Sequence, residues 1–211
     1  MTRNLNRVLI LAPHTDDGEL GCGGTIARFA AEKHDVYYVA FSTAEQSLPV
    51  GFPSNTLELE VKAATKVLGI PPENLIVFKH EVRKLNYVRQ EILEELVKLR
   101  KDIRPNLIFL PSPNDLHQDH STVSEEGVRA FKHSSILGYE LLWNNISFNT
   151  QSFVILTEKH VKTKIKALAE YRSQRHRKYL TKDFIIGWAR TRGTQINADY
   201  AEAFEVLRWI I

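Results

Sequence analysis

Residues 8–25 read VLILAPHTDDGELGCGGT, and this stretch decides the fold that the sequence predicts. Its first part, Val8–Ala12, is apolar and rich in branched residues, which is typical of a strand buried on both faces. A polar cluster over residues 13–17 follows, then a glycine-rich turn over 21–24 and helical spacing over 25–31. A buried strand that leads through a polar loop into a helix is the opening unit of an α/β fold.

Strands and helices continue to alternate along most of the chain. Hydrophobic spacing predicts strands over residues 36–41, 75–78 and 107–110 and helices over 57–68, 88–103 and 121–131. Further on it predicts strands over 138–143 and 153–156 and a helix over 159–175, and it leaves 203–211 undecided. The alternation favours an α/β fold of three layers with a doubly wound, largely parallel, Rossmann-like sheet. No linker or repeat interrupts it, so a single domain is expected over residues 1–211.

The composition is that of an ordinary globular protein. Of the 211 residues, 43% are hydrophobic and 25% are charged, and the formal net charge is +3, so disorder is not expected. The densest basic run is Arg172–Lys178, RSQRHRK, which reads either as a solvated helix face or as a rim that attracts an anionic substrate. Because the excess of positive charge is mild, no nucleic-acid partner is predicted.

The sequence also bears on redox state and location. Cys22 is the one cysteine, so no intrachain disulfide can form. A nucleophilic role for Cys22 would require a base and a lowered pKa, and we expect a small buried residue instead. No run approaches the ~20 apolar residues that a membrane span needs. The first residues lack the pattern of a signal peptide, and the expected location is therefore the cytoplasm.

Two polar clusters directly follow the first and fourth predicted strands. They are residues 13–17, PHTDD, and residues 114–120, NDLHQDH. In doubly wound sheets ligands bind outside the carboxyl ends of the strands, so both clusters are expected at one edge of the sheet. Imidazole and carboxylate suit zinc and similar ions, and a catalytic zinc site takes three protein ligands and leaves one position open. Two ligands from one cluster and one from the other would be the economical arrangement.

Each of these residues, taken alone, has a simpler interpretation. A lone histidine after a strand is commonly a hydrogen-bonded loop residue, and Asp16 with Asp17 can cap the following helix. Two loops that are both dense in histidine and aspartate, at equivalent ends of two strands, are harder to explain in that way. Their joint arrangement favours a metal site.

The two clusters resemble the signature of the PIG-L/LmbE family of N-acetylglucosaminyl deacetylases. In that family a strand ends in A-H-P-D-D before a glycine-rich turn and a helix, and H-x-D-H follows later. The matching segments here are Ala12–Asp17, Gly18–Thr25 and His117–His120, and Tyr171–Gln174, Arg192–Gly193 and Tyr200–Phe204 resemble later parts of the family. The chain departs from the pattern at Thr15, where the family has proline, and at Ser42–Glu45, which lacks the usual glycine before Glu45.

The resemblance implies an LmbE-type fold and a metal centre. By resemblance, His14, Asp17 and His120 are the expected metal ligands. Zn²⁺ is the expected ion, and Fe²⁺ or another divalent ion could use the same ligands.

The resemblance also implies roles for three neighbouring residues. Asp16 would be the general base, and His117 would stabilise the oxyanion or act as general acid. Asp119 would orient one of the histidines from outside the ligand set. The implied reaction is hydrolysis of an N-acetyl or other N-acyl group from a small amino-sugar substrate, with phosphorylated and nucleotide-linked sugars among the candidates. The alternatives are a metallo-amidase acting on a non-sugar amide and a non-catalytic sugar- or nucleotide-binding module; a homo-oligomer is compatible with the sequence.

Several other residues are left with two interpretations. The pair Arg190 and Arg192 could bind a substrate phosphate or carboxylate, or form surface salt bridges. Trp143 and Trp188 could stack on a sugar ring, although core packing is the more usual role. Tyr200 and Glu202 belong to the family-like C-terminal segment, and their roles stay open.

Overall fold

Seven strands form one sheet in the order β3-β2-β1-β4-β5-β7-β6 in the computed structural model, which describes residues 6–210. The strands are β1 (Arg7–His14), β2 (Asp35–Ser42), β3 (Leu75–Val77), β4 (Leu107–Pro111), β5 (Ser135–Tyr139), β6 (Ser152–Leu156) and β7 (Tyr200–Arg208). From β3 to β5 in this order the strands are parallel, whereas β7 is antiparallel to both β5 and β6. The predicted largely parallel α/β sheet is confirmed.

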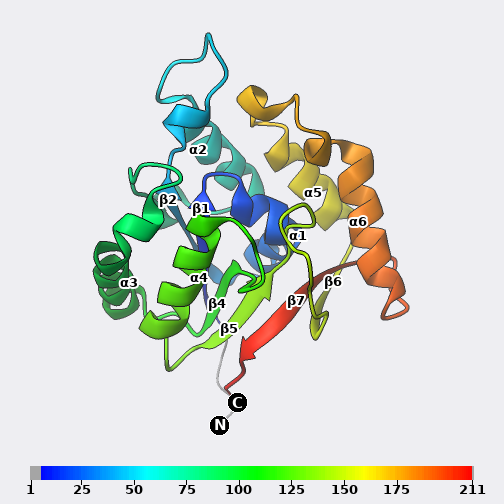
Figure 1. The fold of residues 1–211 in the computed structure, drawn as a ribbon. Helices are drawn as coiled ribbons and strands as arrows, with labels where there is room; N and C mark the ends of the chain where they lie inside the picture. The colour runs from blue at the N-terminus through cyan, green and yellow to red at the C-terminus, as the bar shows by residue number, and fades with distance from the viewer. Residues whose placement is uncertain (1–5, 211) are drawn as a thin grey trace.

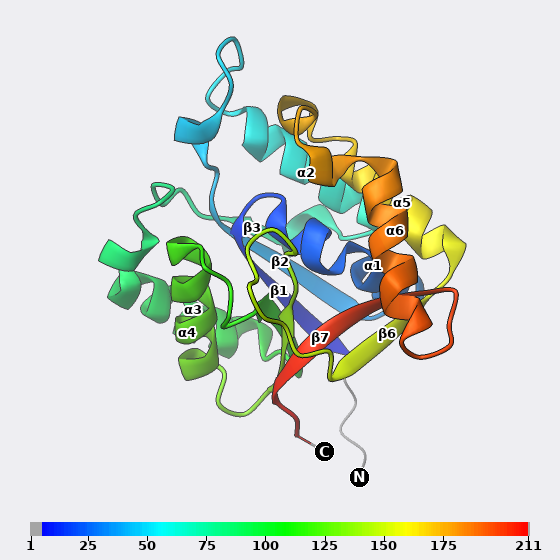
Figure 2. The same ribbon diagram turned by 45° about the vertical axis from the view of Figure 1, so that its right-hand side comes forward.

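Helices cover both faces of the sheet. They are α1 (Asp17–Ala31), α2 (Thr56–Leu68), α3 (Arg89–Ile103), α4 (Gln118–Ala130), α5 (Glu158–Leu168) and α6 (Lys182–Thr194), with short 3₁₀ turns η1 (Glu45–Ser47), η2 (Pro72–Asn74), η3 (Leu85–Tyr87), η4 (Arg172–Gln174) and η5 (Lys178–Leu180). Figures 1 and 2 show α3 and α4 on one face and α1, α2, α5 and α6 on the other. Among residues 6–210, no helix combines the length and the apolar character needed to cross a lipid bilayer.

The central strand β1 explains the three layers. Val8, Ile10 and Ala12 pack into the core on the α1 side, and Leu9 and Leu11 pack into the core on the α3 side. Because successive side chains of a strand point to opposite faces, a strand between two helical layers is apolar at every position. The uninterrupted apolar run that the sequence shows is therefore required by this central place in the sheet.

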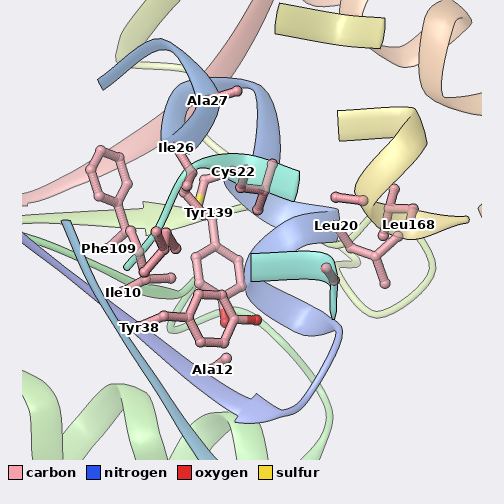
Figure 3. Close-up of a cluster of buried hydrophobic side chains, with 14 of the residues drawn as sticks. Ile10, Ala12, Leu20, Cys22, Ile26, Ala27, Tyr38, Phe109, Tyr139 and Leu168 are labelled. Carbon is pink, nitrogen blue, oxygen red and sulfur yellow. The ribbon is translucent and has the colours of Figure 1, made fainter. Parts of the chain in front are cut away.

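The glycine-rich stretch is part of a helix, which corrects the expected turn over residues 21–24. Helix α1 begins at Asp17 and continues through these glycines, with a kink at Cys22, which is buried as predicted. Figure 3 shows the rings of Tyr38 and Tyr139 beside this helix. A Cβ atom added to Gly21 would lie 2.3 Å from the Tyr139 ring. A Cβ atom added to Gly18, one turn earlier, would lie 2.6 Å from the Tyr38 ring. Gly18 and Gly21 therefore allow two aromatic rings, from β2 and β5, to approach the helix backbone.

Three further boundaries differ from the sequence predictions. The strand expected over 138–143 is β5 at 135–139, because its pairing with β4 begins at Ser135. The helix expected over 159–175 ends at Leu168, and a 3₁₀ turn follows the buried Tyr171. The undecided segment 203–211 lies mostly in β7, and α6 was not predicted. The predicted lack of a signal peptide concerns residues 1–5, which, with residue 211, lie outside the described part of the chain.

The C-terminal strand β7 supports elements on which the site is built. Glu202 accepts hydrogen bonds from the backbone N–H groups of Gly24 (3.0 Å) and Thr25 (2.7 Å) in α1. Glu205 accepts hydrogen bonds from the Ser112 hydroxyl and from the Asn114 amide (3.1 Å) in the loop after β4. Two carboxylates of one strand thus fix the helix that follows β1 and the loop that follows β4.

Candidate active site

The two polar clusters meet at the topological switch point of the sheet. Strand β1 lies between β2 and β4, and from there the sheet extends in one direction through β2 and β3 and in the other through β4 and β5. Crevices form at this point, outside the carboxyl ends of the strands. His14 is the last residue of β1, and His120 lies in the first turn of α4. The helix expected over 121–131 starts at Gln118, so His120 is held by a helix rather than by a loop.

Three donor atoms converge between the clusters. His14 Nδ1 lies 3.0 Å from Asp17 Oδ2, which lies 3.2 Å from His120 Nε2. The third side of this triangle, from His14 Nδ1 to His120 Nε2, measures 3.3 Å. Ligand atoms that share one tetrahedral zinc ion at bond lengths near 2.0–2.2 Å lie roughly 3.3–3.5 Å apart. The donor set and its spacing therefore fit a divalent ion.

A carboxylate behind each of the two imidazoles fixes its orientation. His14 Nε2 lies 2.9 Å from Asp119 Oδ2, and His120 Nδ1 lies 2.7 Å from Asp115 Oδ2. An imidazole that donates its outer N–H to a carboxylate keeps the lone pair of its inner nitrogen free for a ligand. Asp119, the residue expected to orient one of the histidines, lies next to His14. Asp115 was not assigned a role, although its place in the same polar cluster as His120 was a usable signal.

Charge also shapes the three donor groups. Burial lowers the pKa of His14, but the carboxylates of Asp17 and Asp119 outweigh burial and raise it to about 9. Burial likewise lowers the pKa of His120, while Asp17 and Asp115 raise it to about 10. Burial raises the pKa of Asp17, and the two histidines then bring it well below its ordinary value. The two imidazoles are therefore surrounded by carboxylates, Asp17 between them and Asp119 and Asp115 behind them.

His117 forms the N-cap of α4, next to the triangle. Its Nδ1 accepts a hydrogen bond from the Asp119 backbone N–H (3.2 Å), and its ring stacks on that of His120 at a centroid distance of 4.5 Å. Burial, followed by the charges of His120 and His14, lowers the pKa of His117 to about 4. The three histidines offer nitrogen atoms within 4.8 Å of one another, so His117 could also contribute to a metal site. The tighter set contains Asp17.

Asp16 is at the N-cap position of α1, but its side chain makes no capping hydrogen bond. The simple capping interpretation therefore fails for this residue. Its carboxylate lines the cavity beside the triangle. Burial and the charge of Asp17 raise the pKa of Asp16 to about 6, while the charges of His14 and Arg177 lower it.

A cavity of about 290 Å³ opens over these groups. One part of its wall is apolar, and another carries Trp143, Asn144 and two arginines; the lining residues beyond the polar clusters are Leu20, Ala44, Ser47, Leu57, Val82, Arg83, Trp143, Asn144, Gln174, Arg177 and Tyr179. Ala44, where the family pattern has glycine, adopts a left-handed backbone with φ +49°. Sequence reasoning missed Leu57, Val82 and Arg83 because no motif marks their segments.

Most of the other residues with open interpretations do not line this cavity. The guanidinium of Arg192 pairs with the buried Glu140, and Trp188 donates a hydrogen bond of 2.9 Å to the same carboxylate. Arg190 lies 5.7 Å from the ring centroid of Tyr200 at the surface. Glu202, described above, supports α1. Of the two tryptophans, Trp143 lines the cavity and stacks on Tyr179 at 3.9 Å.

Known proteins resemble this chain in sequence and in structure. The uncharacterized deacetylase YaiS of Escherichia coli (strain K12) is 26% identical over 179 residues, which cover 79% of this chain and 90% of YaiS. The diacetylchitobiose deacetylase of Thermococcus kodakarensis (strain ATCC BAA-918 / JCM 12380 / KOD1) is 28% identical over 135 residues, 60% of this chain and 49% of that enzyme. The crystal structure of the conserved protein TT1542 from Thermus thermophilus has a TM-score of 0.84 at 27% identity, and the match covers 99% of this chain and 97% of TT1542.

The family model described as PIG-L, GlcNAc-PI de-N-acetylase, matches residues 9–131. This range is more than half of the chain and contains most of β1, all of α4 and both polar clusters. The resemblance drawn from the two motifs is confirmed: the chain belongs to the PIG-L family of deacetylases.

Proposed function

We propose that this protein is a metal-dependent hydrolase that removes an N-acetyl or related N-acyl group from an amino sugar or its conjugate. The observation that carries the proposal is the triangle of His14 Nδ1, Asp17 Oδ2 and His120 Nε2, with sides of 3.0–3.3 Å, at the floor of a cavity. Membership of a deacetylase family supports the reaction, and the diacetylchitobiose deacetylase among the relatives supports a sugar substrate.

His14, Asp17 and His120 would hold the ion, for which Zn²⁺ is the first candidate and Fe²⁺ the second. We prefer Asp17 over His117 as third ligand because Asp17 Oδ2 is within 3.2 Å of both other donors. When bound, such an ion supplies Lewis acidity, which polarises an amide carbonyl and lowers the pKa of water. The outer carboxylates Asp115 and Asp119 hold the imidazoles ready for it.

Asp16 would act as the general base. Its carboxylate faces the cavity, and a pKa of about 6 leaves it ionised at neutral pH yet more basic than an exposed aspartate. It can take a proton from the attacking water. The same carboxyl group can then return this proton to the leaving nitrogen, so that the free amine and the carboxylic acid are the products.

His117 would stabilise the oxyanion rather than serve as general acid. With a pKa of about 4, its ring is neutral at pH 7. Since its Nδ1 accepts the Asp119 backbone N–H, the ring proton of neutral His117 is on Nε2. An Nε2–H is a hydrogen-bond donor for the oxygen on which negative charge develops.

Acetate release tests the proposal. Purified protein, its metal content measured by elemental analysis, is incubated with a panel of N-acetylated sugars, nucleotide sugars and N-acetylated non-sugar amines. We expect acetate from at least one sugar, released at least about 100-fold more slowly by the Asp16→Asn variant. Acetate from non-sugar amides alone would favour the metallo-amidase alternative. Bound metal with no turnover of any compound would favour the binding module.

A further inference from the structure

Two arginines line the cavity without a carboxylate partner. Arg83 follows β3 in the chain, and Arg177 belongs to the basic run between η4 and η5. Within residues 6–210, neither guanidinium forms an ion pair, whereas Arg192, Arg129 and Arg89 each pair with a glutamate. Since an arginine keeps its charge at all physiological pH values, an unpaired guanidinium that borders a cavity is available to an anionic ligand.

Arg177 is held in place by neutral partners. Its Nε donates a hydrogen bond of 2.6 Å to Oε1 of the buried Gln174, whose Nε2 donates to the Ser173 hydroxyl at 3.2 Å. Ser173 in turn donates to a carboxylate oxygen of Glu60 at 2.6 Å. The guanidinium lies 5.7 Å from the ring centroid of Tyr179. These hydrogen bonds fix Nε, and the Arg177 side chain also hydrogen-bonds to that of Tyr179. Among residues 6–210 no carboxylate pairs with its guanidinium, whose fork of N–H groups suits phosphate and carboxylate.

Arg177 shares its cavity with the proposed general base. Both Arg177 and Asp16 line this cavity, so an anion bound by Arg177 would lie in the same cavity as the scissile amide. Tyr179, beneath Arg177, stacks on Trp143 with an interplanar angle of 9°. These rings limit the movement of the guanidinium.

Arg83 approaches the same cavity from a separate segment. Its backbone N–H donates a hydrogen bond of 2.6 Å to Asp119, and its Nη2 donates one of 3.0 Å to the Ser47 hydroxyl. Its backbone is left-handed, with φ +67°, a conformation that non-glycine residues adopt rarely. The residue is therefore anchored to the carboxylate that orients His14, while its charge remains unneutralised at the cavity.

We propose that Arg177, assisted by Arg83, forms an anion subsite, and that the preferred substrate is an N-acylated amino sugar with a phosphate or carboxylate group near the amide. This inference rests on the proposed function, because it names the substrate class of the same site. The run Arg172–Lys178 could be a solvated surface or a rim that attracts an anionic substrate. Within this run we assign the anion-binding role to Arg177 alone. Arg175 and Lys178 are exposed and do not line the cavity.

Paired substrates test the subsite. N-acetylglucosamine is compared with its 1-phosphate, with its uridine diphosphate conjugate and with N-acetylmuramic acid, which carries a carboxylate. The enzymes are the wild type, Arg177→Gln and the matched control Arg175→Gln, all verified as folded by thermal unfolding. We expect kcat/KM of the wild type to be at least about 10-fold higher on one anionic class. Arg177→Gln should lose about 10- to 100-fold on that class, mainly through KM, the loss expected for one charged hydrogen-bonding partner.

On the neutral sugar Arg177→Gln should lose clearly less kcat/KM than on the anionic class, and Arg175→Gln should resemble the wild type throughout. Phosphate-bearing and carboxylate-bearing substrates distinguish the two sources of negative charge. Equal losses on neutral and anionic sugars would overturn the subsite, because Arg177 would then serve Asp16 instead. Equal losses in the Arg175→Gln control would overturn it too.

Binding separates this inference from the proposed reaction. Calorimetric titration with N-acetylglucosamine 1-phosphate and with N-acetylglucosamine needs no turnover. If no sugar releases acetate but Arg177→Gln abolishes the tighter binding of the phosphate, the anion subsite stands and the proposed reaction fails. If sugars are deacetylated with no preference for anions in rate or binding, the reaction stands and the subsite fails.

Discussion

The inner ring nitrogens of His14 and His120 lie 3.3 Å apart, although 106 residues of chain separate these two histidines. One histidine ends β1 and the other lies in the first turn of α4, so two rigid elements set the distance. Asp17, the first residue of α1 and three residues after His14, completes the triangle. The chemistry that we propose requires these three donor atoms to lie close together, and most of the following predictions test that arrangement.

Replacing His120 by alanine should remove a metal ligand. We expect the affinity for Zn²⁺ to fall by more than the about 10- to 100-fold that is typical of changes outside the ligand set. The measurement is elemental analysis after dialysis, together with competition against a chelator. His133→Ala, at an exposed position, is the matched control. Full metal occupancy in His120→Ala would refute the ligand assignment.

Replacing Asp16 by asparagine should separate catalysis from metal binding. The variant keeps the three donor atoms, so we expect normal metal content and a kcat reduced by about 10²- to 10⁴-fold, as for loss of a general base. In the wild type kcat should decline as the pH falls through about 6, where Asp16 becomes protonated. Asp102→Asn, exposed on α3, controls for the loss of one surface charge. Near-normal turnover in Asp16→Asn would contradict its role.

The two outer carboxylates should differ in what they support. Asp115→Asn and Asp119→Asn should each weaken metal binding or activity by about 10- to 100-fold. Asp119 also accepts two backbone hydrogen bonds from a separate segment, from Arg83 (2.6 Å) and Leu85 (3.2 Å), whereas Asp115 accepts one from the nearby His117 (2.8 Å). Replacing Asp119 should therefore lower the unfolding temperature more than replacing Asp115. Metal titration and thermal unfolding of both variants provide the comparison. Equal metal affinity in wild type and Asp115→Asn would show that this carboxylate does not hold His120.

Metal binding should release protons at neutral pH. In the metal-free protein the pKa values of His14 and His120 are raised to about 9 and about 10, so both rings are protonated at pH 7.5. A metal ion binds the neutral rings, so about two protons must leave and the apparent affinity should rise with pH up to about 9–10. Calorimetry in buffers of different ionisation enthalpy counts these protons. Binding without proton release would contradict the raised pKa values.

The same shifts predict how the stability of the metal-free protein depends on pH. A histidine whose pKa is raised on folding stabilises the native state fully below its ordinary pKa of 6.5, and this contribution is lost as the pH rises through the folded value. The unfolding free energy of metal-free protein should therefore decrease between about pH 6.5 and 10. Denaturant unfolding with and without metal tests this, because the metal-bound rings no longer titrate there.

The glycine at position 21 should be needed for packing. Gly21→Ala would place a Cβ atom 2.3 Å from the Tyr139 ring, an overpacking that typically costs about 1–3 kcal/mol of unfolding free energy. Gly187→Ala is the matched control, because Gly187 is exposed on α6 and a Cβ there meets no atom within 4 Å. We expect Gly187→Ala to raise stability by about 0.5–1 kcal/mol through helix propensity. Similar unfolding temperatures for both variants would contradict the packing role of Gly21.

The sequence predicted the centre of the fold better than its periphery. Val8–Ala12 could be identified because a strand covered on both faces leaves a continuous apolar run, which few other elements produce. Both polar clusters could be placed at one edge because each follows such a strand. Local propensity disfavours glycine in helices and so predicts a turn over residues 21–24, whereas the packing of Gly21 against Tyr139 explains why glycine is tolerated in α1. Tertiary packing of this kind leaves no periodic signal.

Within the site, residues inside the two motifs could be predicted and residues that approach from elsewhere could not. Leu57 and Arg83 line the cavity from segments that carry no motif, and only the sheet topology brings them there. Arg177 was visible as part of a basic run, yet its spacing could not distinguish it from the exposed Arg175. What singles it out is the hydrogen bond to Gln174, which depends on the irregular turn after α5.

Strand β7 is the last strand in chain order, yet it lies inside the sheet between β5 and β6. During synthesis β6 therefore has no partner strand until residues 200–208 have emerged from the ribosome. The same strand brings Glu202 to α1 and Glu205 to the loop after β4. A chain that stalls, or is cleaved, before residue 200 therefore lacks the carboxylates that hold α1 and the loop after β4. Both segments that carry the candidate site gain this support only when β7 has joined the sheet.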